Sequence, residues 1–540
     1  MPVSTDPRAG SDPVTDEELP ESTAVSDEKR HESSAVPDDE REALVSLAHG
    51  AVVTGGGVSV RRLLSITTDA ALARGLGPVA YGVYALGWRF ATMLLRFANL
   101  GANYTLMRDL PAYEGDPDRQ RRVAGLAYVT TAVASVGIAT ALFLAADWIN
   151  GATISKASFP TVLRLFAVLL VVLAFVRMHA VMLRAAKSAN GEVLFRRLLR
   201  PAARLIGAVG AVALGYSVVG VVGGLIGTLG VLAVFGYPAA VATAGTRPTI
   251  RGLGSEARRF YDHAVPSAVG NVGKLLRLRI DVLLIGWLLT AVAAGVYNVV
   301  LLVVGLAAIP LMAFNQLMPP VASDLHSSGR TDTLDEVYTV VARLIVTATV
   351  PLLAIEAVFG RELLAAFGAE YTQGYAVLLV FLFGRFVANA VGATGILLSM
   401  TSHQYAKMGL EWILAALNVL LTYLFVLEFG LIGAAVGTSL AIGFQNFLQA
   451  VLLRRFEGLW PFDRTFLKPI GAGIGMGVAM LAVRYALDGA LSVVVGTGVG
   501  LLAFAGLLLA FGVEPRDRFV VGELTAEYRS VARRRIAAVR

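Results

Sequence analysis

A succession of long apolar segments is the feature that most constrains the fold of this chain. From Ala43 onward one apolar segment follows another, and each can cross about 30 Å of hydrocarbon as a helix of about 20 residues. A chain that spans a membrane in this way satisfies its backbone hydrogen bonds within each helix. The sequence therefore predicts an all-α polytopic membrane protein with about 14 transmembrane helices. The predicted spans are 44–72, 80–107, 123–147, 158–183, 198–215, 217–243, 262–288, 291–320, 336–359, 372–399, 407–428, 430–453, 468–487 and 490–512.

Composition excludes several other classes of protein. With 56% apolar and only 16% charged residues, the chain is not a water-soluble globule. The absence of cysteine excludes disulfides, thiolate metal sites and a cysteine nucleophile. The six histidines show no paired spacing, and no phosphate-binding loop motif occurs, so we expect no metal, no cofactor and no direct use of ATP.

The net charge of +7 is divided unevenly along the chain. Residues 1–42 contain 13 acidic and 4 basic residues, a net charge of −9, so residues 43–540 carry +16. The acidic segment has too few apolar residues to fold alone, which predicts a disordered acidic cytoplasmic tail over 1–42. Because the basic excess belongs to the membrane part, no nucleic-acid partner is needed to explain it.

The loops between the predicted spans differ in basic residues according to the side they face. If the N-terminus is cytoplasmic, the cytoplasmic loops and C-terminal tail carry 26 Lys and Arg residues, whereas the external loops carry at most four. Basic loops are retained on the cytoplasmic side of a membrane. This pattern predicts a multi-pass protein of the cytoplasmic (cell) membrane with both termini cytoplasmic, including a basic tail over 513–540.

An internal repeat with an offset of 213 residues divides the chain into halves. Gly82-Val83-Tyr84 recurs as Gly295-Val296-Tyr297, and Gly220 and Gly224 recur as Gly433 and Gly437. Such repeats are typical of transporters built from two similar halves around a central site. We therefore predict an N-terminal six-helix lobe over 44–243, a C-terminal six-helix lobe over 262–453 and an appended helix pair over 468–512.

Basic residues within the predicted spans indicate a cavity. Burying a Lys or Arg side chain at the centre of a bilayer costs at least roughly 2.5–3.5 kcal/mol. Such residues therefore usually face a protein interior or a water-filled cavity. Arg164, Arg177, Arg204 and Arg343 lie near span ends, where they are expected to snorkel to the headgroups. The others cluster on the first, second and seventh spans, and guanidinium groups there suit a phosphate or diphosphate. The predicted phosphate-binding residues are Arg61, Arg62, Arg89, Arg96, Lys274 and Arg277.

Three carboxylates lie well inside the predicted spans and are candidates for coupling to H⁺ or Na⁺: Asp69, Asp281 and Glu356. Each has a simpler explanation, because Asp281 can neutralise Arg277 and Asp69 can neutralise Arg62. We favour neutralisation for Asp69 and leave both interpretations open for Asp281 and Glu356.

Several segments resemble a known family. The stretch from Ala73 to Tyr84, followed by Asn99-Leu100-Gly101, resembles the opening of polysaccharide-biosynthesis flippases of the multidrug/oligosaccharidyl-lipid/polysaccharide exporter superfamily. Residues 279–286 and 294–297 resemble the start of that family's second half, and Phe367-Gly368-Ala369-Glu370-Tyr371 and residues 430–435 match later landmarks. The resemblance implies alternating access between two lobes and transfer of a polyprenyl- or dolichyl-linked glycan to the outer leaflet. It also implies that Arg61, Arg62, Lys274 and Arg277 line the cavity.

Three functions are compatible with these observations. The first is a flippase, not an enzyme, for lipid-linked oligosaccharides carried on a polyprenyl or dolichyl phosphate or diphosphate, in surface polysaccharide or glycoprotein assembly. Its partners would be the lipid-linked glycan, membrane lipids and glycan-assembly enzymes. The second, a cation-coupled multidrug antiporter of the same superfamily, is disfavoured by the basic interior and by fourteen rather than twelve spans. The third, a membrane glycan polymerase or ligase, is disfavoured by the short external loops.

Overall fold

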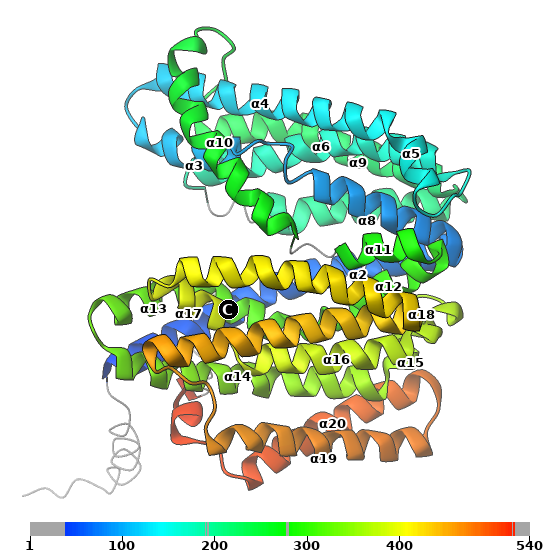
Figure 1. The fold of residues 1–540 in the computed structure, drawn as a ribbon, viewed down its shortest axis with the longest axis vertical. Coiled ribbons are helices and arrows are strands. Elements are labelled where there is room, and N and C mark those ends of the chain that lie inside the picture. The colour runs from blue at the N-terminus through cyan, green and yellow to red at the C-terminus, as the bar shows by residue number, and fades with distance from the viewer. Residues whose placement is uncertain (1–37, 189–190, 192–193, 277–279, 521, 524–540) are drawn as a thin grey trace, which may run out of the picture.

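The computed structural model describes residues 38–188, 191, 194–276, 280–520 and 522–523, with only the backbone given for 38, 39, 42, 53, 197, 269–276 and 280. Every regular element in these described ranges is a helix, which confirms the predicted all-α class (Figure 1). Most of the predicted acidic tail and most of the basic tail lie outside the described residues. The helices are α2 (Asp38–Leu94), α3 (Ala102–Ala112), α4 (Pro117–Leu144), α5 (Ala146–Gly151), α6 (Phe159–Ala185), η1 (Leu194–Leu199), α8 (Arg200–Ala213), α9 (Val218–Ala244), α10 (Gly254–Leu276), α11 (Ile280–Leu288), α12 (Ala291–Val304), α13 (Ile309–Ser327), α14 (Thr331–Val358), α15 (Gly360–Ala365), η2 (Ala369–Gly374), α16 (Tyr375–Ala390), α17 (Thr394–Met400), α18 (Gln404–Glu457), η3 (Arg464–Phe466), α19 (Leu467–Ala486) and α20 (Gly489–Ala510).

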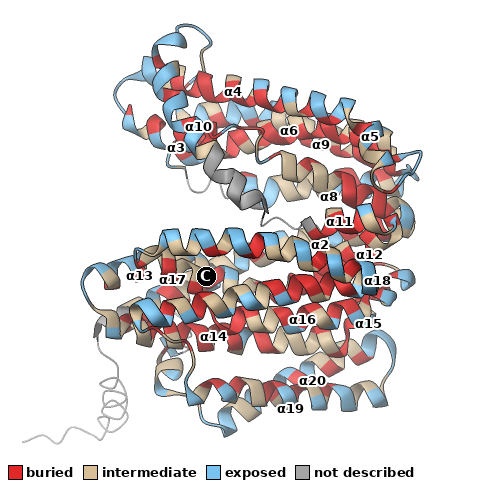
Figure 2. Ribbon diagram, in the orientation of Figure 1, coloured by how far each residue is buried: buried red, intermediate tan, exposed pale blue. Residues whose placement is uncertain are grey.

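The lengths and surfaces of these helices suit a membrane. Among the described residues, nine helices are long and apolar enough to cross a bilayer, or ten if α12 and α13, bent by 60°, form one span. Large apolar residues are exposed on the outward faces of α4, α9, α19 and α20, whereas buried residues concentrate where helices face one another (Figure 2). An exposed apolar surface of this extent requires lipid contact.

Two of the helices are hairpins whose arms cross the molecule separately. α2 reverses at Gly77, which has a φ of 73°. As a result, the Tyr81 hydroxyl lies only 3.2 Å from the Asp69 carboxylate. In a straight helix, twelve residues would span about 18 Å. α18 reverses in the same way at Gly430, which brings the hydroxyls of Thr422 and Thr438 to 3.3 Å. Counting each arm separately, the arrangement is consistent with the predicted fourteen crossings.

The second predicted span, 80–107, is not continuous. Helix α2 ends at Leu94, and α3 begins only at Ala102, after Leu100 and Gly101 adopt φ values of 41° and 79°. A Cβ at Gly101 would lie 1.9 Å from the carbonyl oxygen of Ala264, so the glycine allows α10 to touch this break directly. The tertiary contact with α10 therefore interrupts a segment that is apolar enough to be one helix.

The helices form two groups with an appended pair (Figure 1). We call α3, α4, α5, α6, α8 and α9 the first helix group, and α11 to α18 the second helix group; α19 and α20 pack on α14. Helix α2 contacts both groups, because Gly50 faces Leu317 of α13 while Asp69 binds Arg204 of α8. Helix α10 packs mainly on α3 and α4. Each predicted lobe thus packs its first helix partly against the other lobe.

Candidate functional site

A cavity of about 770 Å³ lies where α2 faces α6, η1 and α8. Its lining extends to Arg184 near the C-terminal end of α6 and to Arg196 of η1. No acidic residue is among the described residues that line it, and its neutral polar residues include Ser65, Asn103 and Tyr104. Eight arginines line it, which we call the arginine cavity: Arg61, Arg62, Arg96, Arg177, Arg184, Arg196, Arg200 and Arg204.

Helical spacing brings most of these arginines onto cavity-facing surfaces. Arg200 and Arg204 are one turn apart on α8, and Arg196 precedes them in η1, while Arg177 and Arg184 are two turns apart on α6. From the sequence, these residues were expected in loops or in the headgroup region, whereas all five line the cavity. The four-residue spacing of the three arginines from Arg196 onward was a signal that could have revealed them.

The arginines of the cavity repel one another. The charges of Arg177, Arg204, Arg61 and Arg196 all act on Arg200. Among the described residues, Arg96, Arg177, Arg184 and Arg200 form no ion pair. Like charges held together in a partly dehydrated space are unfavourable unless an anion joins them. The arrangement is therefore suited to a ligand with several negative charges.

Arg204 is a cavity arginine that pairs with a buried carboxylate. Its Nη2 atom lies 3.0 Å from Oδ1 of Asp69, which is 3% exposed, and its guanidinium stacks 4.3 Å over the ring of Trp88. The carboxylate of Asp69 thus neutralises Arg204 of α8, a partner that the prediction, which named Arg62, did not include. The expected snorkelling of Arg204 was wrong, because its side chain is only 12% exposed and pairs with Asp69.

Arg62 and Arg89 join α2 to α12. Arg62 lines the arginine cavity and also donates to the carbonyl oxygens of Leu301 and Leu302, at 3.0 and 2.7 Å. Arg89 donates to Oδ1 of Asn298 at 3.2 Å and does not line the cavity. Of the other predicted phosphate ligands, Arg61 and Arg96 line the cavity, Arg277 lies outside the described residues, and Lys274 belongs to α10 with its side chain undescribed.

The candidate coupling residues do not share one location. Asp281 lines a second cavity of about 270 Å³ in the second helix group, with Asn418 and Thr438, and accepts a hydrogen bond from the Tyr297 hydroxyl at 2.7 Å. Glu356 is 2% exposed, and Arg385 and Arg62 are the basic residues that act on its charge. In the part of the chain that the structure describes, no group of three or more His, Asp or Glu side chains is placed to hold a metal ion.

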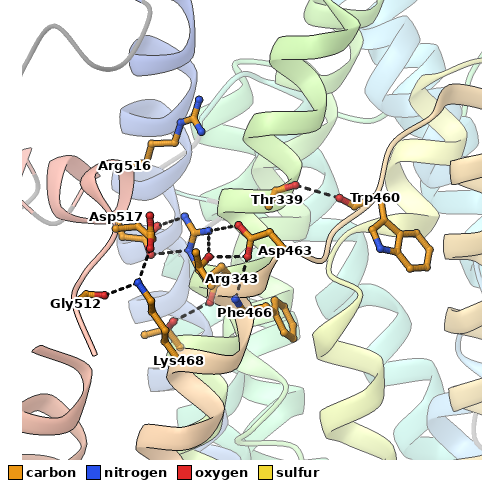
Figure 3. A network of polar contacts seen from close by, with 12 residues as sticks. Thr339, Arg343, Trp460, Asp463, Phe466, Lys468, Gly512, Arg516 and Asp517 are labelled. Atoms are coloured by element: carbon orange, nitrogen blue, oxygen red, sulfur yellow. Dashed lines mark hydrogen bonds and ion pairs between the residues drawn. The ribbon is translucent and has the colours of Figure 1, made fainter. Parts of the chain in front are cut away.

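Arg343 was predicted to snorkel, and the structure contradicts this. Its guanidinium forms ion pairs with Asp517 at 2.7 Å and Asp463 at 2.9 Å, and its side chain is only 5% exposed. Figure 3 shows these contacts, together with the Lys468 ammonium bound to the carbonyl of Gly512. The network ties the segment after α20 to α14 and to the start of α19. Sequence reasoning missed it because Asp517 is 174 residues away from Arg343.

Three comparisons relate the chain to known proteins. The family described as "Polysaccharide biosynthesis protein" matches residues 71–374. The chain is 23% identical over 220 residues to the protein named "Probable low-salt glycan biosynthesis flippase Agl15" of Haloferax volcanii, a match that covers 41% of this chain and 46% of that protein. The chain thus spans less than half the length of this curated relative.

The fold is similar to those of two solved transporters. The structure titled "Lipid II flippase MurJ, inward closed conformation" matches with a TM-score of 0.67 and 14% identity, covering 85% of this chain and 98% of that one. An inward-facing multidrug resistance MATE family transporter of the MOP superfamily matches with a TM-score of 0.60 and 15% identity, covering 76% and 98%.

Proposed function

Because the chain belongs to the polysaccharide biosynthesis protein family, we propose that it is a flippase for a lipid-linked oligosaccharide. In this proposal the phosphate or diphosphate of a polyprenyl or dolichyl carrier binds in the arginine cavity while its hydrocarbon tail stays in the bilayer. The names of the relatives, a glycan biosynthesis flippase and a lipid II flippase, support this substrate class.

The observation that carries the proposal is the environment of Arg200. Four other arginines act on its charge, and no acidic side chain lines the cavity among the described residues. Phosphate and sugar groups cannot enter hydrocarbon without replacing their lost hydration. A set of guanidinium groups supplies that replacement through charge-assisted hydrogen bonds.

The same observation disfavours the other two functions. A cation-coupled antiporter binds cationic drugs, which eight arginines would repel, although the fold is shared with MATE transporters. A glycan polymerase or ligase needs catalytic groups outside the membrane, and the described connections on the arginine-poor side are short. The chain acts as a transporter and not as an enzyme in this proposal.

The remaining parts of the proposal concern topology, lobes and coupling. The protein lies in the cell membrane with both termini in the cytoplasm. The arginine cavity receives its substrate from the cytoplasmic leaflet, where lipid-linked glycans are assembled. Glycan-assembly enzymes are partners of the protein. The lobes over 44–243 and 262–453 move relative to each other, and the pair over 468–512 accompanies the second. Since Asp69 is occupied by Arg204, the H⁺- or Na⁺-coupling candidates are Asp281 and Glu356.

The test is transport of a fluorescent lipid diphosphate oligosaccharide in liposomes containing the purified protein. We expect Arg200→Gln to lower the rate by about 10- to 100-fold, because one charge-assisted hydrogen bond contributes roughly 1.5–3 kcal/mol. The matched control is Arg251→Gln, which removes an exposed arginine from the loop before α10 and should transport normally.

Two results would overturn the proposal. One is an unchanged rate for Arg200→Gln at equal protein incorporation. The other is transport of a cationic dye, but not of the lipid diphosphate, by the unmodified protein. H⁺ and Na⁺ gradients applied in the same liposomes identify the coupling ion.

A further inference from the structure

We propose that Asp69 is a positioning residue that transmits occupancy of the arginine cavity, through Tyr81 and Asn298, to the contact between α2 and α12. The inference rests on the proposed function in one respect, which is that an anionic group binds in the cavity. It identifies how binding there reaches a contact between the two halves of the chain.

The chain of hydrogen bonds begins at the cavity. Arg204 lines it, and its Nη2 atom donates to Oδ1 and Oδ2 of Asp69 at 3.0 and 3.1 Å and to the Tyr84 hydroxyl at 3.1 Å. Asp69 itself does not line the cavity and is 3% exposed. A ligand can therefore reach Arg204 directly but can affect Asp69 only through Arg204.

The chain continues across the boundary between the halves. The Tyr81 hydroxyl donates to Oδ1 of Asp69 at 3.2 Å and accepts from Nδ2 of Asn298 on α12 at 2.8 Å. Oδ1 of Asn298 then accepts from Arg89 at 3.2 Å. Because Tyr81 is fully buried, no water can easily replace a hydrogen bond that its hydroxyl loses.

These bonds lie beside the closest approach of α2 and α12. A Cβ at Gly82 would lie 1.8 Å from the carbonyl oxygen of Ala291, and one at Gly295 would lie 3.3 Å from the Cα of Gly82. The two backbones therefore touch at Gly82, the residue that follows Tyr81. We call this the α2–α12 contact, and a small movement of Tyr81 changes it.

An anion in the cavity competes with Asp69 for Arg204. When the guanidinium turns toward the anion, the buried Asp69 carboxylate loses one of its donors and draws the Tyr81 hydroxyl closer to replace it. The hydroxyl then moves away from Asn298, and the α2–α12 contact loses a hydrogen bond. Binding in the arginine cavity thus favours separation of α2 and α12, which a flippase requires after loading its substrate.

The absence of native cysteine allows this to be measured with spin labels. Lys156→Cys, between α5 and α6, and Gln373→Cys, in η2, place labels on exposed residues of the two groups at the end where α5 and α15 lie (Figure 1). Pulsed electron paramagnetic resonance in nanodiscs gives their distance distribution with and without geranylgeranyl diphosphate. We expect the probe to increase the long-distance population.

Tyr81→Phe removes the central hydroxyl without altering a cavity residue. We expect geranylgeranyl diphosphate to bind this variant with unchanged affinity. Its effect on the ratio of the long-distance to the short-distance population should be about fivefold smaller than in the unmodified protein, which is the size of a typical allosteric coupling. Tyr84→Phe is the matched control, because its buried hydroxyl also bonds Arg204 but not Asn298. That variant should respond as the unmodified protein does.

A second measurement needs no ligand. Arg204→Gln withdraws the cation from Asp69 and should therefore increase the long-distance population. In a protein that already carries Tyr81→Phe, the additional substitution Arg204→Gln should not change this population further. Additive effects of the two substitutions would overturn the relay, as would a full probe response in Tyr81→Phe. Failure of the unmodified protein to bind the probe would instead count against the lipid diphosphate as substrate, and the ligand-free comparison would still decide the relay.

Discussion

At the scale of single residues, Gly305 provides the space that Arg62 occupies. A Cβ at position 305 would lie 1.5 Å from an Nη atom of Arg62, which donates to the carbonyl oxygens of Leu301 and Leu302. These carbonyls lie in the last turn of α12, where the one of Leu301 also accepts from the backbone N–H of Gly305 at 3.2 Å, so Arg62 adds a side-chain donor at the helix end. The glycine thus lets a basic residue of α2 complete the end of a helix from the other half of the chain.

Gly305→Ala should displace Arg62 and lower the free energy of unfolding by about 1–3 kcal/mol, as overpacking does in well-packed sites. The backbone at position 305, with a φ of −66°, accepts alanine, so the effect would come from the displaced guanidinium. Denaturant unfolding in detergent measures it. Gly227→Ala, at a position with nothing within 4 Å of the added methyl group, is the control and should stabilise α9 slightly. Equal stabilities of both variants would contradict the prediction.

At the scale of elements, the first turn of α2 is bound to α14 and to the segment after α20. Glu40 is fully buried and lies 2.7 Å from Nε of Arg516, whose Nη2 atom lies 2.7 Å from Glu336. Burial and the hydrogen bond with the nearby Glu336 carboxylate raise the pKa of Glu40 to about 6, although Arg516 opposes them. Three elements distant in sequence therefore meet at a group that titrates near neutrality.

This raised pKa makes stability depend on pH in a defined direction. A carboxyl group whose pKa is higher in the folded protein stabilises the fold below its unfolded pKa, near 4.5, and loses that contribution as the pH rises through about 6. Glu40→Gln should therefore reduce the fall in Tm between pH 5 and pH 8. The control is Glu114→Gln, because the hydrogen bond from Lys187 lowers the pKa of this exposed group. An unchanged pH dependence in Glu40→Gln would contradict the prediction.

At the scale of the whole molecule, the two halves touch at the α2–α12 contact, whereas the arginine cavity is lined by residues between positions 61 and 229 of the first half. The α2–α12 contact depends on the absence of a side chain at Gly82, where an added Cβ would overlap the carbonyl oxygen of Ala291 at 1.8 Å. Backbone atoms cannot move aside as a flexible side chain can. The conformation described here is therefore accessible to this chain only with glycine at position 82.

Gly82→Ala should shift the spin-label pair at positions 156 and 373 toward longer distances and slow lipid diphosphate transport about 5- to 150-fold, since overpacking costs roughly 1–3 kcal/mol. The substituted protein should still insert, because the position lies at a helix contact and not in a topology-determining loop. Gly137→Ala, which adds a methyl group to α4 with nothing within 4 Å, is the control for both measurements. Unchanged distances in Gly82→Ala would show that the contact tolerates the methyl group.

The predictability of the site differed among its residues. Arg61, Arg62 and Arg96 were recognisable because a basic residue in the middle of an apolar span needs a cavity. Arg184, Arg196 and Arg200 were not, because basic residues near the end of a span are equally explained by the headgroup region. Only the packing of α6 and α8 against α2 distinguishes these explanations, and it makes the second set as much a part of the cavity as the first.

The sequence alone determined the helical class, the order of the apolar segments, the basic interior and the family, since these follow from composition, hydrophobic periods and local motifs. The tertiary structure decided which charges meet. Asp69 pairs with Arg204, Arg343 pairs with Asp517, and Gly82 meets Ala291. Each of these contacts joins residues more than a hundred positions apart, so it depends on how the helices pack in three dimensions and not on any local pattern along the chain.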